Sequence, residues 1–408
     1  MSLKNFFGLP KNVCVLGIVS LLMDISSEMI YPLVPLFLNN VLYASKTSIG
    51  LIEGIAESMA SVLKVFSGWL SDRLGKRKSI ILWGYGISVF SRPILATASS
   101  WIGVLTYRFT DRVGKGVRTA PRDAIIADST DKSILGKAFG FHRTMDTTGA
   151  AIGAFIAFLI LNFLHGSFRS AFWFSMVPSV LALLCIIFFV KDTKKAPALK
   201  TLSLRIHFSD SNFSRFLVVV TVFTLGKTSD AFLILRAQEL GVSVAVIPVL
   251  YLTFNISSAL FSTPAGMVTD KVGGKGMILF SYFLFSLIFI GFAFATNQIH
   301  AWMLFIVYGI FVAINDGVQR AYVGTVIRSE ITGTGYGVYH TIVGIASLPA
   351  SIIGGALWQK FGSHALFFYG AMMSWVSIVL FVILLYFFGN KAPGKPEKGE
   401  YISNQSPR

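Results

Sequence analysis

The sequence is poor in cysteine and in charge. Only two of its 408 residues are cysteines, Cys14 and Cys185, and both lie inside apolar stretches. This excludes a disulfide framework and favours buried structural thiols over a catalytic one. Charged residues make up 13% of the chain and hydrophobic residues 54%, whereas an average soluble domain is about 25% charged. The composition is that of a membrane protein.

Several chemical signatures are also missing. The sequence shows no metal-ligand cluster, no nucleophile elbow and no Ser/His/Asp set, and the Gly-Lys-Gly at 114–116 lacks the spacing of a phosphate loop. We therefore expect neither an enzyme nor a bound cofactor or metal. The first apolar stretch is too long for a signal peptide and lacks a small-residue cleavage site, which predicts that it stays in place as an anchor.

Long apolar stretches recur along the whole chain instead. Each runs for about 20 to 27 residues, the length that an α-helix needs to cross about 30 Å of hydrocarbon. Transmembrane strands would alternate with a period of two over about ten residues, and these stretches do not. The sequence thus predicts an all-α membrane protein with twelve transmembrane helices, at about 13–38, 47–70, 78–97, 101–127, 137–163, 168–190, 214–238, 244–269, 277–295, 300–326, 336–359 and 364–388.

Positive charge is distributed unevenly among the connections. Lys and Arg total 35 against 19 acidic residues, and the basic residues gather in alternate loops and the tail, while connections such as "TASS" and "TNQI" carry none. The positive-inside rule then predicts a multi-pass protein of the inner (plasma) membrane with both termini cytoplasmic. The charge is interpreted as topology and contact with the lipid bilayer, and not as nucleic-acid binding.

The chain repeats itself after about 200 residues. Gly68, Asp72 and Gly75 of "GWLSDRLG" align with Gly266, Asp270 and Gly273 of "GMVTDKVG". We therefore predict two pseudo-symmetric six-helix bundles, 1–190 and 214–390, joined by a cytoplasmic linker at 191–213 and followed by a disordered tail at 391–408.

The string Gly-x3-Asp-x2-Gly-Lys-Arg-Lys, beginning at Gly68, resembles the signature loop of the major facilitator superfamily (MFS). The resemblance implies the MFS fold and a monomeric secondary transporter that binds a small molecule near the midplane between its halves. It also implies a gating motif, whose plain alternative is an ordinary basic turn. The implied gating residues are Gly68, Asp72, Gly75 and Arg77, with the second copy Gly266, Asp270 and Gly273.

The predicted helix at 101–127 carries an unusual set of charges. At 100° per residue its charged side chains share one arc of about 120°, and a charge at bilayer depth costs about 2.5–3.5 kcal/mol unless it meets a partner or water. Its "RVGKGVRTA" resembles an MFS motif in which Lys115 replaces glutamine and Arg118 replaces glycine. These extra cations predict an anionic substrate, unless they only pair with acids. The predicted substrate-binding residues are Arg108, Arg112, Lys115, Arg118, Arg143 and Lys227.

Acidic side chains lie at the same predicted depth. Asp24 and Glu28 are four residues apart on one helical face, just before a bend expected at Pro32 and Pro35. Such groups can exchange protons as a cavity opens and closes, although each could equally be a static ion-pair partner. The predicted proton-coupling residues are Asp24, Glu28, Asp230, His142, Asp146 and Glu57.

The sequence as a whole predicts transport of a small organic anion by alternating access, coupled to protons. "DISSEMIYPLVPLFL" and "DRVGKGVRTAPRDA" are similar to a bacterial inner-membrane MFS subgroup, a few members of which are tied to carboxylate siderophores. Proton-driven efflux of drugs or cations is the alternative, although only half of the antiporter motif is present: Gly140, Gly149 and Gly153 match, and Ala154 replaces its proline. A membrane sensor without transport activity is the alternative of another class.

Overall fold

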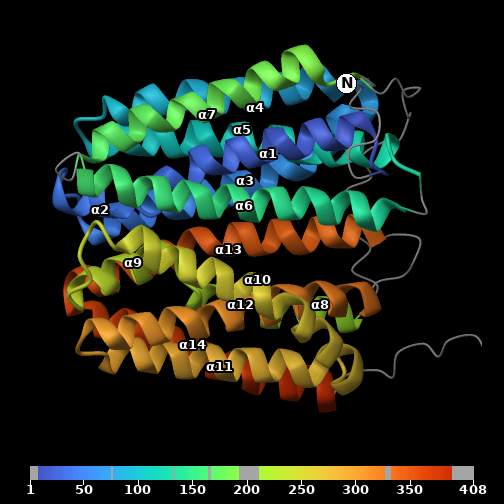
Figure 1. Ribbon diagram of the computed structural model, residues 1–408. Helices are drawn as coiled ribbons and strands as arrows, with labels where there is room; N and C mark the ends of the chain where they lie inside the picture. Colours follow the sequence, from blue (N-terminus) through green and yellow to red (C-terminus); the bar gives the residue numbers. More distant parts are fainter. Residues whose placement is uncertain are drawn as a thin grey trace, which may run out of the picture.

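The computed structural model describes residues 8–74, 77–131, 134–163, 167–192, 211–326 and 332–387. In these ranges all regular elements are helices, and they run along one common axis (Figure 1). The predicted all-α fold is confirmed, and most predicted helices agree with the structure to within a few residues. The predicted linker and tail lie mostly or wholly outside the described residues, so the domain division stays a prediction.

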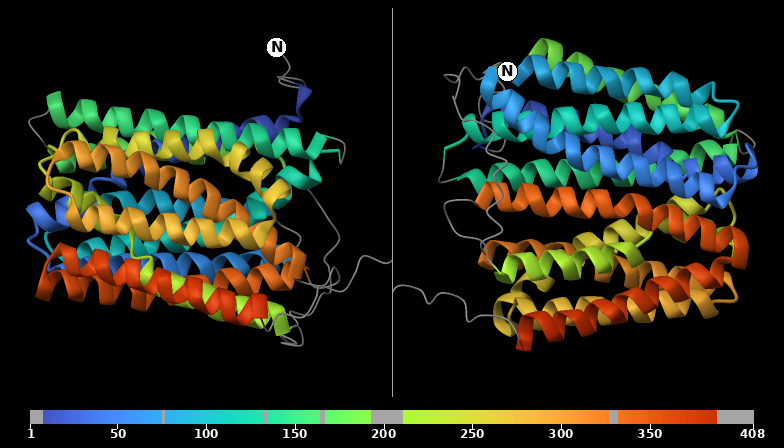
Figure 2. Two further views of the ribbon diagram at one scale, coloured as in Figure 1. Left: turned by 90° about the horizontal axis from the view of Figure 1, so that it is seen from below. Right: turned by 180° about the vertical axis from the view of Figure 1, so that it is seen from behind.

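The first group of helices is α1 (Lys11–Ile30), α2 (Val34–Asn40), α3 (Lys46–Leu74), α4 (Arg77–Ala96), α5 (Trp101–Asp128), α6 (Leu135–Phe163) and α7 (Phe168–Phe189). The second is α8 (Ser211–Gly226), α9 (Asp230–Glu239), α10 (Ile247–Val272), α11 (Gly274–Phe294), α12 (Gln298–Val326), α13 (Thr332–Phe361), α14 (Ser363–Phe381) and the π-helical turn η4 (Val382–Phe387). The two groups, here called the N half and the C half, lie side by side in Figure 1 and in the right view of Figure 2.

The first predicted helix is broken where its prolines fall. Residues 31–33 form turns between α1 and α2, and a proline occupies the first turn of α2, where a missing N–H costs nothing. The prediction of one continuous helix at 214–238 is wrong: the chain leaves the helix at 227–229. Ser229 caps the next helix, since its side chain accepts a hydrogen bond from Ala231 N at 3.2 Å.

The two broken helices and the ten unbroken ones together are consistent with twelve passes through a membrane. In the residues that the structure describes, nine segments are long and apolar enough to cross a membrane. The three long helices outside that set, α3, α5 and α10, carry polar side chains that face the interior of the protein. Large apolar side chains such as Trp83 and Phe90 are more than 70% exposed, as lipid-facing residues are.

Glycines bring α1 and α6 into close contact. A Cβ atom on Gly149 would lie 2.4 Å from the backbone oxygen of Leu21, and one on Gly153 would lie 2.5 Å from that of Ile25. Only glycine permits such an approach of two backbones, as is common in membrane helices. Gly140, of the same motif, is different, because a Cβ atom added there would have nothing within 4 Å.

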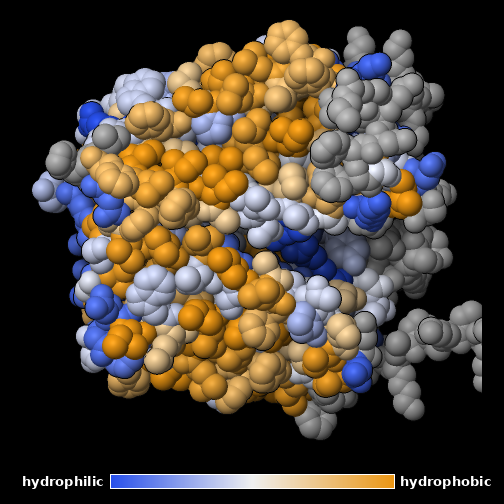
Figure 3. All heavy atoms as spheres, in the orientation of Figure 1, coloured by the Kyte–Doolittle hydropathy of each residue, from blue (hydrophilic) through white to orange (hydrophobic). Residues whose placement is uncertain are grey.

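The two halves meet at one end of the bundle. We call the end where α1 begins the N-terminal side and the opposite end the far side. Toward the far side, α3 packs on α13 and Lys46 N donates to Gln359 Oε1 at 2.9 Å, while α2 contacts α9. Toward the N-terminal side a polar hollow is visible between the halves (Figure 3). In the residues that the structure describes, the halves therefore contact each other at the far side and leave a polar hollow toward the N-terminal side.

Candidate functional site

A polar cavity lies between the two halves and has three adjacent lobes. The deep lobe, of about 230 Å³, is formed by α1, α3 and α5 with Tyr251 of α10. The mouth lobe, of about 330 Å³, lies nearer the N-terminal side and adds residues of α4, α6 and α10. The C lobe, of about 280 Å³, lies between α3 and the C half. Tyr31 and Glu57 line both the deep lobe and the C lobe, so these two lobes are adjacent.

All six predicted substrate-binding residues line this cavity. Arg108 and Arg112 line the deep lobe, Lys115 and Arg118 line the deep and mouth lobes, Arg143 lines the mouth lobe and Lys227 the C lobe. Five of the six predicted proton-coupling residues do so too, as Asp24, Glu28, Asp146, Glu57 and Asp230. His142 is buried behind the mouth lobe, where its Nδ1 lies 3.5 Å from Asp146 Oδ2.

Arg108 is already neutralised by a carboxylate. Its Nε donates to Glu53 Oε1 at 2.9 Å, its Nη2 contacts the other oxygen, and both residues are at most 3% exposed. The guanidinium also lies 5.2 Å from the centre of the Tyr31 ring. Ser229 Oγ of the C half is 3.5 Å from Glu53 Oε2, which brings this pair to the contact between the halves. Arg108 has little capacity left for a ligand.

Arg112 is only partly neutralised. Its Nη2 lies 3.4 Å from Glu57 Oε1, while its Nε is buried without a hydrogen-bond partner. Because Glu57 is 47% exposed to the cavity, this pair is open to displacement by a ligand anion.

A second pair supports the back of α5. Asp111 Oδ1 lies 3.5 Å from Arg92 Nη1, and Arg92 donates to Tyr107 Oη at 2.8 Å and to Ser27 Oγ at 3.1 Å. Arg92 was not among the predicted residues. A single arginine inside the apolar stretch 78–97 was the signal that could have identified it.

Arg118 differs from the other arginines of α5. It is 5% exposed, yet no carboxylate lies within 4.0 Å of it in the described part of the chain. It makes two contacts with uncharged groups: Nη1 donates to Ser88 Oγ at 2.5 Å, and the guanidinium lies 4.5 Å from the centre of the Tyr85 ring. Lys115, one turn away and exposed to the cavity, has no ion-pair partner among the described residues either.

Two acids on α1 share these lobes with the unpaired cations. Asp24 and Glu28 line both the deep and the mouth lobe, and neither has a cation within 4.0 Å among the described residues. Glu28 Oε2 is buried without a hydrogen-bond partner. The cavity thus holds cations on α5 and acids on α1 that are close enough to share a lobe but not paired.

Two further charged groups at the mouth lobe, Arg122 and Asp146, have polar partners. Arg122 Nη2 lies 2.9 Å from Asp123 Oδ1, and Ser20 Oγ donates to Asp146 Oδ1. Arg143 is exposed and lines the opening. The pairing of Arg122 with Asp123 agrees with the alternative interpretation of the sequence, in which the cations of this helix only pair with acidic side chains.

The predicted gating motif is partly visible. Arg77 begins α4, is 6% exposed, contacts Asp128 and donates to Ala124 O at 3.0 Å, so it ties α4 to the end of α5. Gly273, between α10 and α11, has a φ of +91°, which favours glycine. Gly68 lies within α3 and Gly266 within α10. Gly75 lies outside the described residues, as do the side chains of Asp72 and Asp270.

Besides the predicted Asp230, the C lobe contains polar residues that the sequence did not single out. Asp230 Oδ1 accepts a hydrogen bond from Tyr308 Oη at 2.7 Å, and Asn315, Asp316 and Gln319 of α12 line the same lobe. Their signal was the polar run "NDGVQR" inside an otherwise apolar predicted helix.

Comparison with known proteins places these observations in a family. The model of the Major Facilitator Superfamily matches residues 16–226 and, separately, 211–407. An uncharacterized MFS-type transporter of Methanocaldococcus jannaschii is 37% identical over 389 residues, which are 93% of this chain and 96% of the relative. A probable 4-methylmuconolactone transporter of Cupriavidus pinatubonensis is 24% identical over 247 residues, 55% of this chain and 56% of that protein.

Solved structures share the fold. The nucleoside transporter NupG superposes with a TM-score of 0.75 at 14% identity, over 93% of this chain and 100% of that one. A bacterial homolog of the human lysosomal transporter Spinster gives a TM-score of 0.72 at 15% identity, over 92% and 95% of the two chains.

Proposed function

Because the chain belongs to the major facilitator superfamily, we propose that it is a secondary transporter of a small organic anion, working by alternating access and coupled to protons. The proposal places it in the inner membrane as a monomer, with the N-terminal side facing the cytoplasm, as the basic loops favour. It treats the N half and the C half as the two bodies that rock around the cavity.

The single observation that supports an anionic substrate is Arg118. A buried charge is costly unless a counter-charge meets it, and Arg118 is 5% exposed without a carboxylate within 4.0 Å among the described residues. A guanidinium offers two parallel N–H groups that match a carboxylate or phosphate. A ligand anion in the deep lobe would supply the missing charge, with Lys115 as a second contact.

Proton coupling follows from the acids on α1. When Asp24 and Glu28 are ionised, they compete with a ligand for Lys115 and Arg118, since all four side chains line the same two lobes. When they are protonated, the lobe keeps its cations and attracts an anion. Loading of protons and of the anion would therefore assist each other, which is the requirement for symport.

Alternation would use the two broken helices. The breaks at 31–33 and 227–229 include Tyr31 and Lys227, which line the cavity. In the opposite state the far side would open, and the gating residues Gly68, Asp72, Gly75 and Arg77, with Gly266, Asp270 and Gly273, would hold the N-terminal side closed.

The test is uptake by the full chain in proteoliposomes with an imposed pH gradient and a panel of labelled carboxylates. We expect Arg118→Gln to lower uptake about 100-fold, because the lost contact is a charge-assisted pair, while Arg118→Lys keeps part of it. Arg169→Gln is the matched control, since Arg169 is exposed on the far side and its one hydrogen bond among the described residues is to Ala98 O. Uptake by Arg118→Gln equal to that of the wild type would refute the anion site.

Coupling is tested separately with Glu28→Gln. Accumulation driven by the pH gradient should disappear in this variant, whereas exchange of labelled for unlabelled substrate at equal pH should continue. Persistence of proton-driven accumulation in both Glu28→Gln and Asp24→Asn would show that the coupling residues lie elsewhere.

Efflux of a cation in exchange for protons is the second candidate, because the unpaired Asp24 and Glu28 could also bind a cation. The same vesicles distinguish anion symport from cation efflux. A cationic substrate would move out as protons move in, and Arg118→Gln would not impair this exchange. Binding of ligands without any flux would favour a sensor.

A further inference from the structure

The C lobe has an excess of carboxylates that the anion site does not use. Among the described residues that line it are three acids, Glu57, Asp230 and Asp316, and one cation, Lys227. Arg112 of the N half compensates Glu57 at 3.4 Å. Among the described residues that line the lobe, Lys227 is then the cation left for the other two carboxylates, and it lies within 4.0 Å of neither of them; Arg320, outside the lining, lies 3.7 Å from Asp316.

Both carboxylates have capacity for a ligand. Asp230 uses Oδ1 to accept from Tyr308 Oη at 2.7 Å, and its Oδ2 has no partner among the described residues. Asp316 Oδ2 is 3.7 Å from Arg320 Nη2, but the two side chains are 48% and 59% exposed. An ion pair with this separation between solvent-exposed side chains contributes little to stability, so a ligand can displace it.

A buried network fixes the wall beside Asp316. Tyr339 Oη donates to Gln319 Oε1 at 2.6 Å, and Gln319 Nε2 donates to Asn315 Oδ1 at 2.8 Å. Asn315 and Gln319 are each 4% exposed. Because these amides hold one another, Asn315 presents its Nδ2 toward Asp316 Oδ1 at 3.5 Å, and the wall is preformed before a ligand binds.

Most of the remaining lining can accept hydrogen bonds. Hydroxyl groups from α3, from the break at 227–229 and from α13 line the same lobe as the two carboxylates, namely those of Ser61, Thr228, Ser229, Ser347 and Ser351. A primary ammonium group has three N–H donors and needs acceptors of this kind. A second carboxylate would instead meet repulsion from Asp230 and Asp316.

We propose that the C lobe is an ammonium subsite and that the ligand is amphoteric: its carboxylate binds at Arg118 and Lys115, and its amine binds at Asp316 with Asp230. The deep lobe and the C lobe share Tyr31 and Glu57, so one extended molecule can occupy both. Such a ligand contacts both halves at once and couples its binding to their relative movement. The anionic end of this inference rests on the proposed function.

The test uses matched ligands that differ only at the end away from the carboxylate: caproate, ε-aminocaproate and adipate, and the longer set caprylate, ω-aminocaprylate and suberate. Affinities for the full chain in detergent are measured by calorimetry, with competition of uptake in proteoliposomes as a second readout. We expect the amino acid of at least one set to bind about tenfold tighter than its alkanoate, a typical difference for one added charge contact. N-acetylation of its amine should remove that advantage in the wild-type protein.

The subsite itself is tested with Asp316→Asn, in which the amine should lose its advantage, and with Asp316→Glu, which should keep part of it. Equal affinity for the alkanoate and the amino acid, or tightest binding of the dicarboxylate, would overturn the ammonium subsite and leave the anion site standing. An unchanged advantage after N-acetylation or in folded Asp316→Asn would overturn it too. If no member of either set binds, the proposed organic-anion function fails and this inference fails with it.

Discussion

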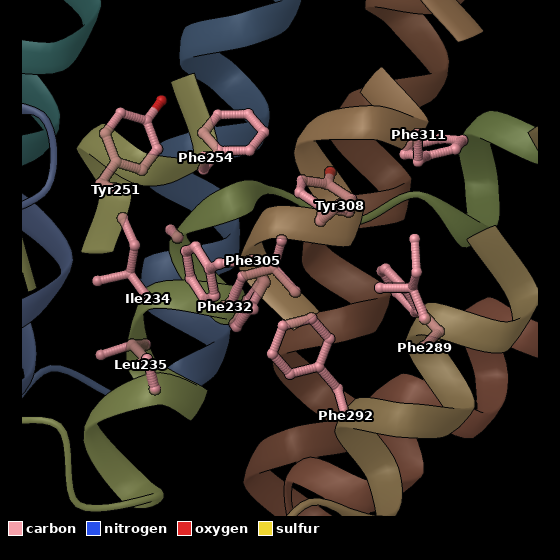
Figure 4. Packing of buried hydrophobic residues seen from close by; sticks show 14 of the residues in the cluster. Phe232, Ile234, Leu235, Tyr251, Phe254, Phe289, Phe292, Phe305, Tyr308 and Phe311 are labelled. Carbon is pink, nitrogen blue, oxygen red and sulfur yellow. The ribbon is translucent and has the colours of Figure 1, made fainter. Parts of the chain in front are cut away.

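The two halves have related topologies but are held together by different side chains. Inside the N half, arginines and acids of α3, α4 and α5 form buried pairs, such as Glu53 with Arg108 and Arg92 with Asp111. Inside the C half, aromatic rings from α9, α10, α11 and α12 fill the interior (Figure 4). Phe285 and Phe289 lie 4.0 Å apart between ring centres, and Phe223 stacks on Tyr282 at 3.9 Å.

This difference shows how the cavity acquires its polarity. In lipid, helices gain little from burying apolar surface against one another, because the lipid tails are equally apolar; packing and internal polar contacts stabilise the bundle. The C half relies on packing and forms a firm wall, whereas the N half relies on charge pairs that leave some cations, notably Arg118, without a partner acid among the described residues. The N half is therefore where loss of one charge should cost most.

The largest effect is expected from Glu53→Ala. Removal of this acid leaves Arg108 buried and unpaired, which costs about 3–5 kcal/mol, and the protein should lose most of its thermal stability in detergent. The double variant Glu53→Met/Arg108→Met should recover much of the loss, since it removes the unpaired charge. Glu239→Gln, which affects the 39% exposed partner of Arg236, is the control and should change little. A single variant as stable as this control would contradict the idea that buried pairs hold the N half.

In the C half the matching change is Phe289→Ala. Phe289 is 1% exposed and contacts the Phe285 and Phe367 rings. We expect a loss of about 3 kcal/mol from the cavity left behind, measured by thermal unfolding. Phe289→Leu should retain more than half of the unfolding free energy that Phe289→Ala loses. A larger loss for Phe289→Ala than for Glu53→Ala would reverse the comparison between the halves.

The contact of α1 with α6 is tested by adding one methyl group. Gly149→Ala brings a Cβ to 2.4 Å from Leu21 O, so the helices must separate, at a cost of about 2 kcal/mol. Gly140→Ala, in the same helix, has open space around the new methyl group and should be neutral or slightly stabilising. Equal stability of the two variants would mean that the helices are not packed as closely as described.

The smallest effect compares the two broken helices. Ser229→Ala removes the side-chain cap of α9 and should cost about 1 kcal/mol, detectable as a small fall in melting temperature. The corresponding break before α2 has no side-chain cap, so no capping contribution is expected there. Ser229→Thr keeps the capping oxygen and should retain the stability of the wild type, and a fall as large as that of Ser229→Ala would argue against capping.

Sequence alone was sufficient for the membrane class, the helix positions and the family. Apolar stretches of membrane-spanning length and the repeated "GWLSDRLG" and "GMVTDKVG" strings are local patterns, and hydrocarbon permits few structures other than helices. The break at Pro32 and Pro35 was equally readable, because proline acts on its own helix. The break at 227–229 was missed, since glycine followed by a capping serine is a weaker signal than proline.

Only the tertiary structure decided which charges are paired. Arg108, Arg112 and Arg118 are the same residue type and lie on one face of α5, yet their partners differ. Arg108 pairs with Glu53, Arg112 lies near Glu57, and Arg118 contacts Ser88 and Tyr85. These partners come from helices far away in the chain, so no pattern within α5 could assign them. The sequence determined that the membrane interior holds cations and acids; the packing of α3 and α4 against α5 determined that Arg118 has no acid of its own among the described residues, because a charge is satisfied by what lies next to it in space.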